Sequence, residues 1–146
     1  MEKYIKQAVD LIKQYEGLSL KVYLDVGGLP TIGYGHLIKL NENFPHEITL
    51  NEAESLLITD LMPFVKTLNS CLQVALGDNQ KAALLCLMYN IGEGAFKSST
   101  LLKKVNLQSP LNEIEIEFNK WIYVAKKPIQ GLISRRKKEF KLFATS

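Results

Sequence analysis

The sequence predicts an α+β fold in which a small N-terminal β-hairpin part is joined to a larger, entirely helical C-terminal part. Residues 2–15 place apolar side chains at helical spacing, and residues 18–36 alternate apolar and polar side chains around a glycine- and proline-containing turn. From residue 49 onward, almost every segment has a helical pattern. The 146 residues are enough for one domain with a buried core, so we expect a single domain made of two unequal lobes.

The N-terminal elements follow from these patterns. The helix over residues 2–15 should stop at Gly17, because glycine readily takes the left-handed conformation that ends helices. Residues 18–36 are typical of strand, turn and strand. Pro30 cannot donate a hydrogen bond to a neighbouring strand, so we expect it at an edge or turn position. Residues 37–48 are expected to form an irregular connection.

The rest of the chain is expected to be helical. Thr49 and Glu52 fit a capping box that begins a connecting helix. Pro63 either begins a further helix or kinks this one. Asp78 can cap the next helix, which is apolar on nearly all sides and therefore belongs in a core. Further helices are expected over residues 98–106, 110–125 and 130–143.

These elements predict where the two lobes divide. The α/β lobe should cover about residues 14–60 and include the connecting helix. The helical lobe should cover about residues 61–146 together with the first helix, residues 1–13. A substrate commonly binds between two such parts.

Composition excludes several classes of protein. Apolar residues make up 47% and charged residues 23%, as in soluble globular domains rather than disordered chains. No apolar run is long enough for a membrane span, and the charged first residues are not typical of a secretory signal. Cys71 and Cys86 are too few for a disulfide scaffold and are expected to be buried thiols. No Cys/His spacing indicates a metal site, and no cofactor is expected.

The net charge of +3 is unevenly distributed. Residues 1–73 carry 6 basic and 9 acidic side chains, and residues 74–146 carry 12 basic and 6 acidic ones. This division is compatible with a polyanionic partner and equally with a solvated surface. It does not by itself predict nucleic-acid binding, because the chain lacks a recognition helix and a platform of aromatic and basic side chains.

Three polar residues near the hairpin are candidates for chemistry. Glu16 ends the first helix, Asp25 closes the first strand, and Thr31 opens the second. Two carboxylates brought together across a helix–hairpin junction suit general acid–base catalysis, and glycoside hydrolysis needs such a pair. A hydroxyl on the same face could orient a water molecule.

The surrounding stretch resembles the catalytic signature of phage-type lysozymes, glycoside hydrolase family 24. The family patterns E-G-x-x-L-x-x-Y-x-D and T-I-G-x-G-H are present as Glu16, Gly17, Leu20, Tyr23 and Asp25, and as Thr31, Ile32, Gly33, Gly35 and His36. The resemblance continues in the family's order through ITLNEAESLLITDL, ALLCLMYNIGEGAFKSSTLL and GLISRRKKEFKLF. It implies a lysozyme-like fold whose two lobes are joined by an inter-lobe helix.

The resemblance also implies roles for the three polar residues. Glu16 would be the general acid that protonates the glycosidic oxygen. Asp25 would activate or position water, or stabilise positive charge on the sugar, and Thr31 would hold the attacking water. This arrangement favours inversion of configuration, which needs carboxylates about 6.5–9.5 Å apart.

Other positions match the family's supporting residues. Arg135, or alternatively Arg136, would reach the general acid, and His36 and Asp60 would form an ion pair with a structural role. The resemblance places Tyr89, Asn90 and Gly92 in the wall of the saccharide site, and Tyr34 is a further candidate for substrate binding.

The resulting hypothesis is an endolysin that acts as a muramidase. It would cleave the β-1,4 bond between N-acetylmuramic acid and N-acetylglucosamine in peptidoglycan and thereby lyse the host cell. We expect a monomer that binds a peptidoglycan strand, does not bind nucleic acid and does not insert stably into membranes. It would stay in the host cytoplasm until a pore releases it to the cell wall and periplasm. The alternative is a cell-wall-binding or toxin-like effector module with the same fold on another glycan.

Overall fold

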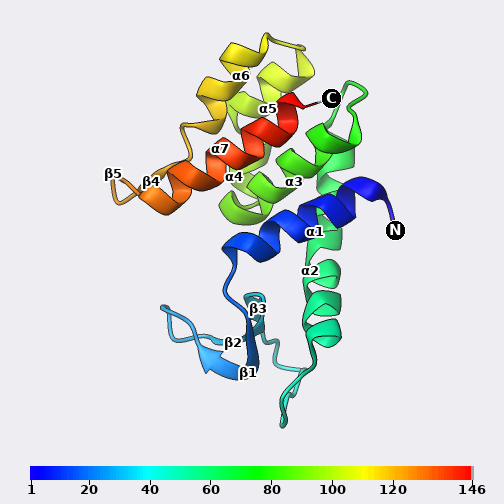
Figure 1. The fold of residues 1–146 in the computed structure, drawn as a ribbon, viewed down its shortest axis with the longest axis vertical. Coiled ribbons are helices and arrows are strands. Elements are labelled where there is room, and N and C mark those ends of the chain that lie inside the picture. The colour runs from blue at the N-terminus through cyan, green and yellow to red at the C-terminus, as the bar shows by residue number, and fades with distance from the viewer. Residues whose placement is uncertain (146) are drawn as a thin grey trace. The chain divides into compact units, whose positions relative to one another are not determined.

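The computed structural model describes residues 1–145, which form two compact units (Figure 1). We call Val9–Met62 the hairpin unit, and Met1–Ala8 with the chain from Pro63 onward the helical unit. Helix α1 (Lys3–Tyr15) and helix α2 (Leu50–Cys71) each contribute residues to both units. The sequence assigns the first helix as far as residue 13 to the helical lobe, whereas the units divide α1 after Ala8.

The hairpin unit contains a three-stranded antiparallel sheet in the order β1-β2-β3. Its strands are β1 (Ser19–Leu24), β2 (Pro30–Gly33) and β3 (His36–Leu37). Tyr23 pairs with Thr31 and Leu24 with Pro30, and the register shifts between Ser19 and Tyr23. The predicted strand–turn–strand pattern is confirmed, and the two-residue β3 adds a third strand.

Residues 25–29 connect β1 to β2. The N–H of Asp25 donates to the carbonyl of Leu29 at 2.9 Å, and the N–H of Gly28 donates to the carbonyl of Asp25 at 2.9 Å. Gly28 has a φ of +78°, the left-handed conformation that such loops require at this position. Pro30 is the first residue of β2, directly after this turn, where its missing N–H is tolerated.

A small apolar core supports the sheet. Ile32, Ile48 and Ala53 are buried, and they join the second strand, the end of the irregular connection and the first turns of α2. Partly buried side chains pack around them, namely Leu20, Tyr34, Ile38, Phe44 and Leu56. This packing fixes β2 and the residues after it relative to the start of α2.

The capping box predicted at the start of α2 is confirmed. The N–H of Thr49 donates to Oε1 of Glu52, and the N–H of Glu52 donates to Oγ1 of Thr49, each at 3.1 Å. The helix then continues through Pro63 as one element of 22 residues. Of the two alternatives for Pro63, a separate helix is therefore wrong.

The helical unit contains the remaining helices and a short hairpin (Figure 1). Helix α7 packs against α3, and the central residues 82–88 of α3 are all buried, as its apolar sequence predicts. The elements are α3 (Asp78–Ile91), α4 (Glu93–Lys97), α5 (Thr100–Asn106), α6 (Leu111–Phe118), β4 (Tyr123–Val124), β5 (Lys127–Pro128) and α7 (Gln130–Ala144).

Asp78 does not cap α3, contrary to the prediction. The N-cap is Gly77, whose extended backbone precedes the helix and whose carbonyl accepts the first helical hydrogen bond, from the N–H of Lys81. The side chain of Gln80 accepts the N–H of Gly77 at 3.0 Å. Asp78 is therefore the first helical residue, where its charge favours the positive end of the helix dipole.

The predicted helix over residues 110–125 is too long. Helix α6 ends at Phe118, and β4 and β5 form a hairpin whose two-residue turn places Ala125 and Lys126 at φ +50° and +68°. Such turns usually contain asparagine and glycine, so an Ala-Lys pair gives no sequence signal for one.

Two further predictions concern the thiols and the membrane. Cys71 and Cys86 are both free, with Cys86 buried and Cys71 partly buried. Within residues 1–145, no helix has the length and apolar character needed to cross a membrane.

Candidate active site

Glu16 directly follows α1, and its carboxylate lies against the backbone of Gly35. The N–H of Glu16 donates to the carbonyl of Ile12 at 2.9 Å, which holds the residue in the last turn of the helix. A Cβ atom on Gly35 would lie 3.7 Å from Oε2 of Glu16. Gly35 has a φ of +83°, which favours glycine. The G-x-G-H segment therefore leaves room beside the Glu16 carboxylate.

Asp25 organises the tip of the hairpin. Its Oδ1 accepts hydrogen bonds from the N–H groups of Gly27 at 2.8 Å and Leu29 at 2.9 Å. Both bonds use the same oxygen, so the turn holds the carboxylate in one orientation. Asp25 is half-buried although the loop around it is exposed.

Thr31 lies on the same face of the hairpin as Asp25. Tyr23 pairs with Thr31, and side chains two residues apart along a strand share a face, so Asp25 and Thr31 are diagonal neighbours. Thr31 is 2% exposed, and its hydroxyl donates to the carbonyl of Leu29 at 2.9 Å. Because the proton is used in this bond, the Oγ1 lone pairs are oriented as acceptors for a water molecule.

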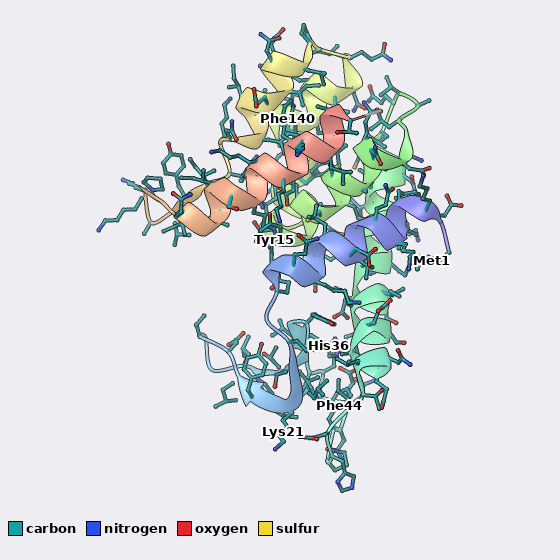
Figure 2. All side chains as sticks on the ribbon, viewed as in Figure 1. Met1, Tyr15, Lys21, His36, Phe44 and Phe140 are labelled. Atoms are coloured by element: carbon teal, nitrogen blue, oxygen red, sulfur yellow. The ribbon has the colours of Figure 1, made fainter. Side chains whose placement is uncertain are left out.

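His36, which is labelled with Phe44 in Figure 2, forms the expected contact with Asp60 and a second one with Glu42. Nδ1 of His36 lies 2.7 Å from Oδ2 of Asp60, and Nε2 lies 2.9 Å from Oε1 of Glu42. The His36 ring is also edge-on to Phe44. The imidazole thus joins β3, the irregular connection and α2. Sequence reasoning missed Glu42, since an acidic residue in an irregular segment carries no spacing signal.

These contacts change the pKa values of the groups involved. Burial favours neutral imidazole, but the hydrogen bonds with Asp60 and Glu42 outweigh it, and the pKa of His36 lies above 6.5. The backbone N–H of Lys39 donates to Glu42 at 2.8 Å, and this bond together with the imidazole lowers the pKa of the Glu42 carboxyl. The two groups are therefore mutually stabilised as an ion pair at pH values between their pKa values.

Tyr34 is held between the small core and a lysine. Its ring packs against the Ile32 cluster, and Nζ of Lys13 lies 5.6 Å from the ring centre. The same ammonium lies 2.6 Å from Oε2 of Glu54, whose hydrogen bond raises the pKa of Lys13. These contacts fix the ring of Tyr34, which lies within the T-I-G-Y-G-H segment.

The other candidate binding residues belong to the helical unit, at the end of α3. The Tyr89 ring packs edge-on against Phe64, with 5.5 Å between the ring centres. Gly92 has a φ of +93° and both ends α3 and begins α4, because its N–H bonds to Met88 and its carbonyl to Phe96. Asn90 is exposed and lies between them in the sequence.

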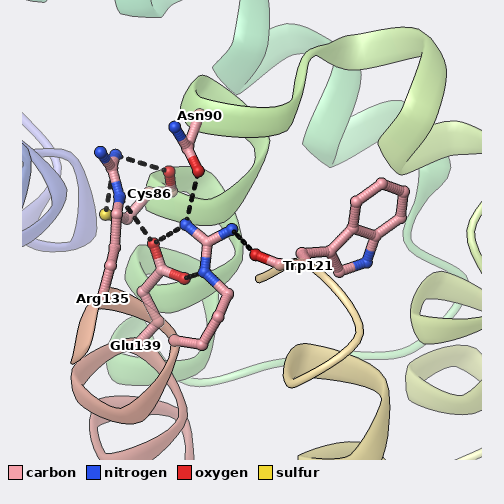
Figure 3. Close-up of polar contacts among 6 residues, drawn as sticks. Cys86, Asn90, Trp121, Arg135 and Glu139 are labelled. Atoms are coloured by element: carbon pink, nitrogen blue, oxygen red, sulfur yellow. Dashed lines mark hydrogen bonds and ion pairs between the residues drawn. The ribbon is translucent and has the colours of Figure 1, made fainter. Parts of the chain in front are cut away.

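Arg135 and Arg136 are buried in a polar network within the helical unit (Figure 3). Both guanidinium groups contact the carboxylate of Glu139, with Nε of Arg136 2.8 Å from Oε1 and Nε of Arg135 3.3 Å from Oε2. Nη2 of Arg136 donates to Oδ1 of Asn90 at 2.7 Å. Burial raises the pKa of Glu139, and the two guanidinium groups oppose that effect. Sequence reasoning missed Glu139, although its spacing from both arginines on one helix is a usable signal.

The predicted residues are divided between the two units. Glu16, Asp25, Thr31, Tyr34, His36 and Asp60 belong to the hairpin unit, and Tyr89, Asn90, Gly92 and Arg135 belong to the helical unit. Among residues 1–145, no group of three or more histidine, cysteine, aspartate or glutamate side chains is arranged to hold a metal ion. Within the hairpin unit, Glu16, Asp25 and Thr31 supply two carboxylates and a hydroxyl.

Comparison with known sequences identifies relatives along nearly the whole chain. Residues 13–139 match the family model described as phage lysozyme. The chain is 41% identical over 140 residues to the endolysin of Acyrthosiphon pisum secondary endosymbiont phage 1, a match covering 93% of this chain and 94% of the relative. It is also 41% identical over 143 residues to the endolysin of Bacillus phage PZA, covering 95% of this chain and 54% of that longer protein.

Solved structures agree with the sequence comparison. A crystal structure of a P22 lysozyme mutant matches with a TM-score of 0.88 and 34% identity, covering 99% of this chain and 100% of that chain. The muramidase domain of SpmX from Asticaccaulis excentricus matches with a TM-score of 0.87 and 31% identity over the whole of both chains. The predicted lysozyme-like α+β fold is confirmed, and the chain belongs to the phage lysozyme family.

Proposed function

We propose that this chain is an endolysin with muramidase activity. Its substrate would be bacterial peptidoglycan, cleaved at the β-1,4 bond between N-acetylmuramic acid and N-acetylglucosamine. The observation that carries the proposal is the placement of Glu16, Asp25 and Thr31 within one compact unit of a chain that belongs to the phage lysozyme family. A solved muramidase domain of the same fold, which matches the whole chain, supports it further.

The proposed mechanism uses the three residues in separate roles. Glu16 donates its proton to the glycosidic oxygen as the bond to the sugar C1 breaks. Thr31 accepts a hydrogen bond from the attacking water, which fixes its position because the hydroxyl proton already bonds to Leu29. Asp25 accepts the water's proton as the new C1–O bond forms. Attack from the face opposite the leaving group inverts the configuration at C1.

The remaining site residues are proposed to support these three. Tyr34, Tyr89, Asn90 and Gly92 would bind the glycan strand. Arg135 would reach the general acid, as the resemblance to the family implies. His36 and Asp60 would keep the hairpin on α2 without taking part in the reaction. We further propose that the chain acts as a monomer on the cell wall, after release from the host cytoplasm, without binding nucleic acid.

A clearing assay on purified peptidoglycan tests the activity. We expect the native chain to clear the suspension and Glu16→Gln to lose at least about a hundredfold in rate, the usual contribution of a general acid. Glu115→Gln makes the same chemical change on an exposed position of α6 and should keep the native rate. Equal clearing by Glu16→Gln and the native chain would assign the acid role to another residue.

Two outcomes separate the finer alternatives. If the native chain binds peptidoglycan without clearing it, the cell-wall-binding effector is the correct function. If it is active, the first product observed by NMR should carry the α configuration at the new reducing end, as inversion requires. A β-configured first product would show that configuration is retained.

A further inference from the structure

We propose that Arg136 and Glu139 are positioning residues that hold the amide of Asn90 with its nitrogen outward, as a hydrogen-bond donor to an oxygen of the glycan. The inference rests on the proposed function, because it states how this chain would contact that substrate. All the residues involved lie in the helical unit, within one compact part of the chain.

The chemistry of the guanidinium fixes the orientation of the Asn90 amide. Nη2 of Arg136 lies 2.7 Å from Oδ1 of Asn90. A guanidinium carries only donors, so it can bond only to the oxygen of the amide and never to its nitrogen. The Asn90 nitrogen must therefore point away from Arg136, as Figure 3 shows. Because Asn90 is exposed, this donor is presented to solvent.

Arg136 is itself held by contacts at all three of its guanidinium nitrogens. Its side chain is completely buried, Nη1 donates to the carbonyl of Trp121 at 3.1 Å, and Nη2 also contacts Glu139 at 3.3 Å. Nε lies 2.8 Å from Oε1 of Glu139. A planar group bound at three positions has one orientation, which is then imposed on Asn90.

Glu139 supplies the negative charge that balances the two arginines of the network. It is completely buried and contacts two arginines, so removing its carboxylate would leave two buried cations without their shared anion. We expect Arg136 to move, because the partners that remain to it are a neutral carbonyl and a neutral amide. Loss of Glu139 should therefore release the Asn90 amide.

The outward donor selects for an acceptor on the ligand. A fixed N–H₂ group binds carbonyl, ether and hydroxyl oxygens and discriminates against groups that offer no lone pair in the same place. The acetamido carbonyls of a peptidoglycan strand are strong acceptors of this kind. If the Asn90 amide could rotate freely, its nitrogen would face the ligand for only half of the time. For the other half, its oxygen would face the ligand, and an oxygen cannot donate.

Binding measurements test the donor. All variants carry Glu16→Gln so that glycan strands freed of stem peptides stay intact during the titration. Asn90→Asp keeps an oxygen for Arg136 but has no donor, so we expect binding to weaken about fivefold to tenfold, the effect of one neutral hydrogen bond, with no loss of thermal stability. The weakening should persist at high salt, which screens charge repulsion. Unchanged binding by Asn90→Asp would overturn the inference. It would also be overturned if the Glu16→Gln chain that keeps Asn90 did not bind the glycan strands.

A double-mutant cycle tests the positioning role. Glu139→Gln should weaken binding at least about threefold when Asn90 is present and less than twofold when Asn90→Ala is also present, because both changes remove the same contact. Its effect on the melting temperature should be equal in both backgrounds. Glu117→Gln is the matched control, since Glu117 is also buried and contacts Lys104 and Lys120. It should lower stability without changing binding.

The results separate this inference from the proposed function. If the fold losses in binding caused by Glu139→Gln and Asn90→Ala multiply, the two changes act independently. That result would overturn the positioning role, even if peptidoglycan is cleared normally. If peptidoglycan is not cleared but binding depends on Asn90 and Glu139 together, the proposed enzymatic function fails and the positioning role stands. If Glu139→Gln does not fold, Arg136→Lys replaces it in the cycle, because lysine keeps the charge and cannot hold the amide and the carboxylate together.

Discussion

Asp25 has two functions in this structure that substitution can separate. As a carboxylate it is a candidate for water activation, and as an acceptor it closes the turn between β1 and β2. Asp25→Ala removes both the charge and the acceptor. Asp25→Asn removes only the charge, because an amide oxygen can still accept from the N–H groups of Gly27 and Leu29. The two variants should therefore be equally inactive and unequally stable.

The expected difference in stability follows from the two hydrogen bonds. Oδ1 of Asp25 accepts at 2.8 and 2.9 Å, both ordinary lengths for strong N–H···O bonds. Each such bond contributes about 0.5–1.5 kcal/mol, so Asp25→Ala should lower the free energy of unfolding by about 1–3 kcal/mol. Asp25→Asn should lower it by less than about 1 kcal/mol. For a chain of this size, 2 kcal/mol corresponds to a melting temperature roughly 4–8 °C lower.

The assay combines urea denaturation with peptidoglycan clearing for both variants. Asp10→Ala, a change of the same type at an exposed position of α1, is the control and should leave both quantities near native. Equal destabilisation by Asp25→Ala and Asp25→Asn would refute the argument from the turn. Full activity of Asp25→Asn would refute the need for a carboxylate while leaving the turn argument intact.

Three other predictions concern the hairpin unit. The raised pKa of His36 means that its ion pair adds stability that is fully present below about pH 6.5 and is lost as pH rises through the His36 pKa, so stability should fall as the pH is raised above about 6.5. Asp60→Asn should lower the NMR titration midpoint of His36 and reduce that fall; an unchanged midpoint would contradict the pairing. Thr49→Ala should cost about 1 kcal/mol in urea denaturation through loss of the N-cap, and no measurable cost would contradict the capping argument. Gly35→Ala should cost about 1–2 kcal/mol from its positive φ and also slow clearing, since the methyl group would contact Glu16; native activity would show that this space is not needed.

Local chemistry explains which parts of the fold could be predicted from the sequence. The Thr49–Glu52 capping box and the buried α3 depend on residues close together in the chain, where spacing alone determines the contact. The β4–β5 hairpin was not predictable, because Ala125 and Lys126 adopt positive φ values that neither residue type favours. Asp78 shows the same limit on a smaller scale, since a good capping residue stands one position beyond the cap.

Some residues of the candidate site could likewise be predicted from the sequence, and others could not. The positions of Glu16, Asp25 and Thr31 follow a compact sequence pattern, and their neighbouring groups come from the same short stretch of chain. The partners Asp60 of His36 and Arg136 of Asn90 come from distant segments. The spacing of Arg136 and Glu139 on one helix is visible in the sequence, but the burial of this pair is evident only once the helices are packed. Sequence reasoning gave these residues plausible roles but did not identify Glu42 or Glu139.

The division of α1 between the two units has a consequence for the order of folding. The hairpin unit is one continuous stretch, Val9–Met62, and its contacts can form as soon as that stretch exists. The helical unit needs the first eight residues together with segments made much later. Asn69 donates to the hydroxyl of Tyr4 across 65 residues, and Gln7 donates to Asn79 across 72. Contacts of such separation form slowly because a long loop must close first. The first turns of α1 therefore cannot make their contacts until most of the polypeptide has been synthesised, and their apolar side chains stay exposed until then.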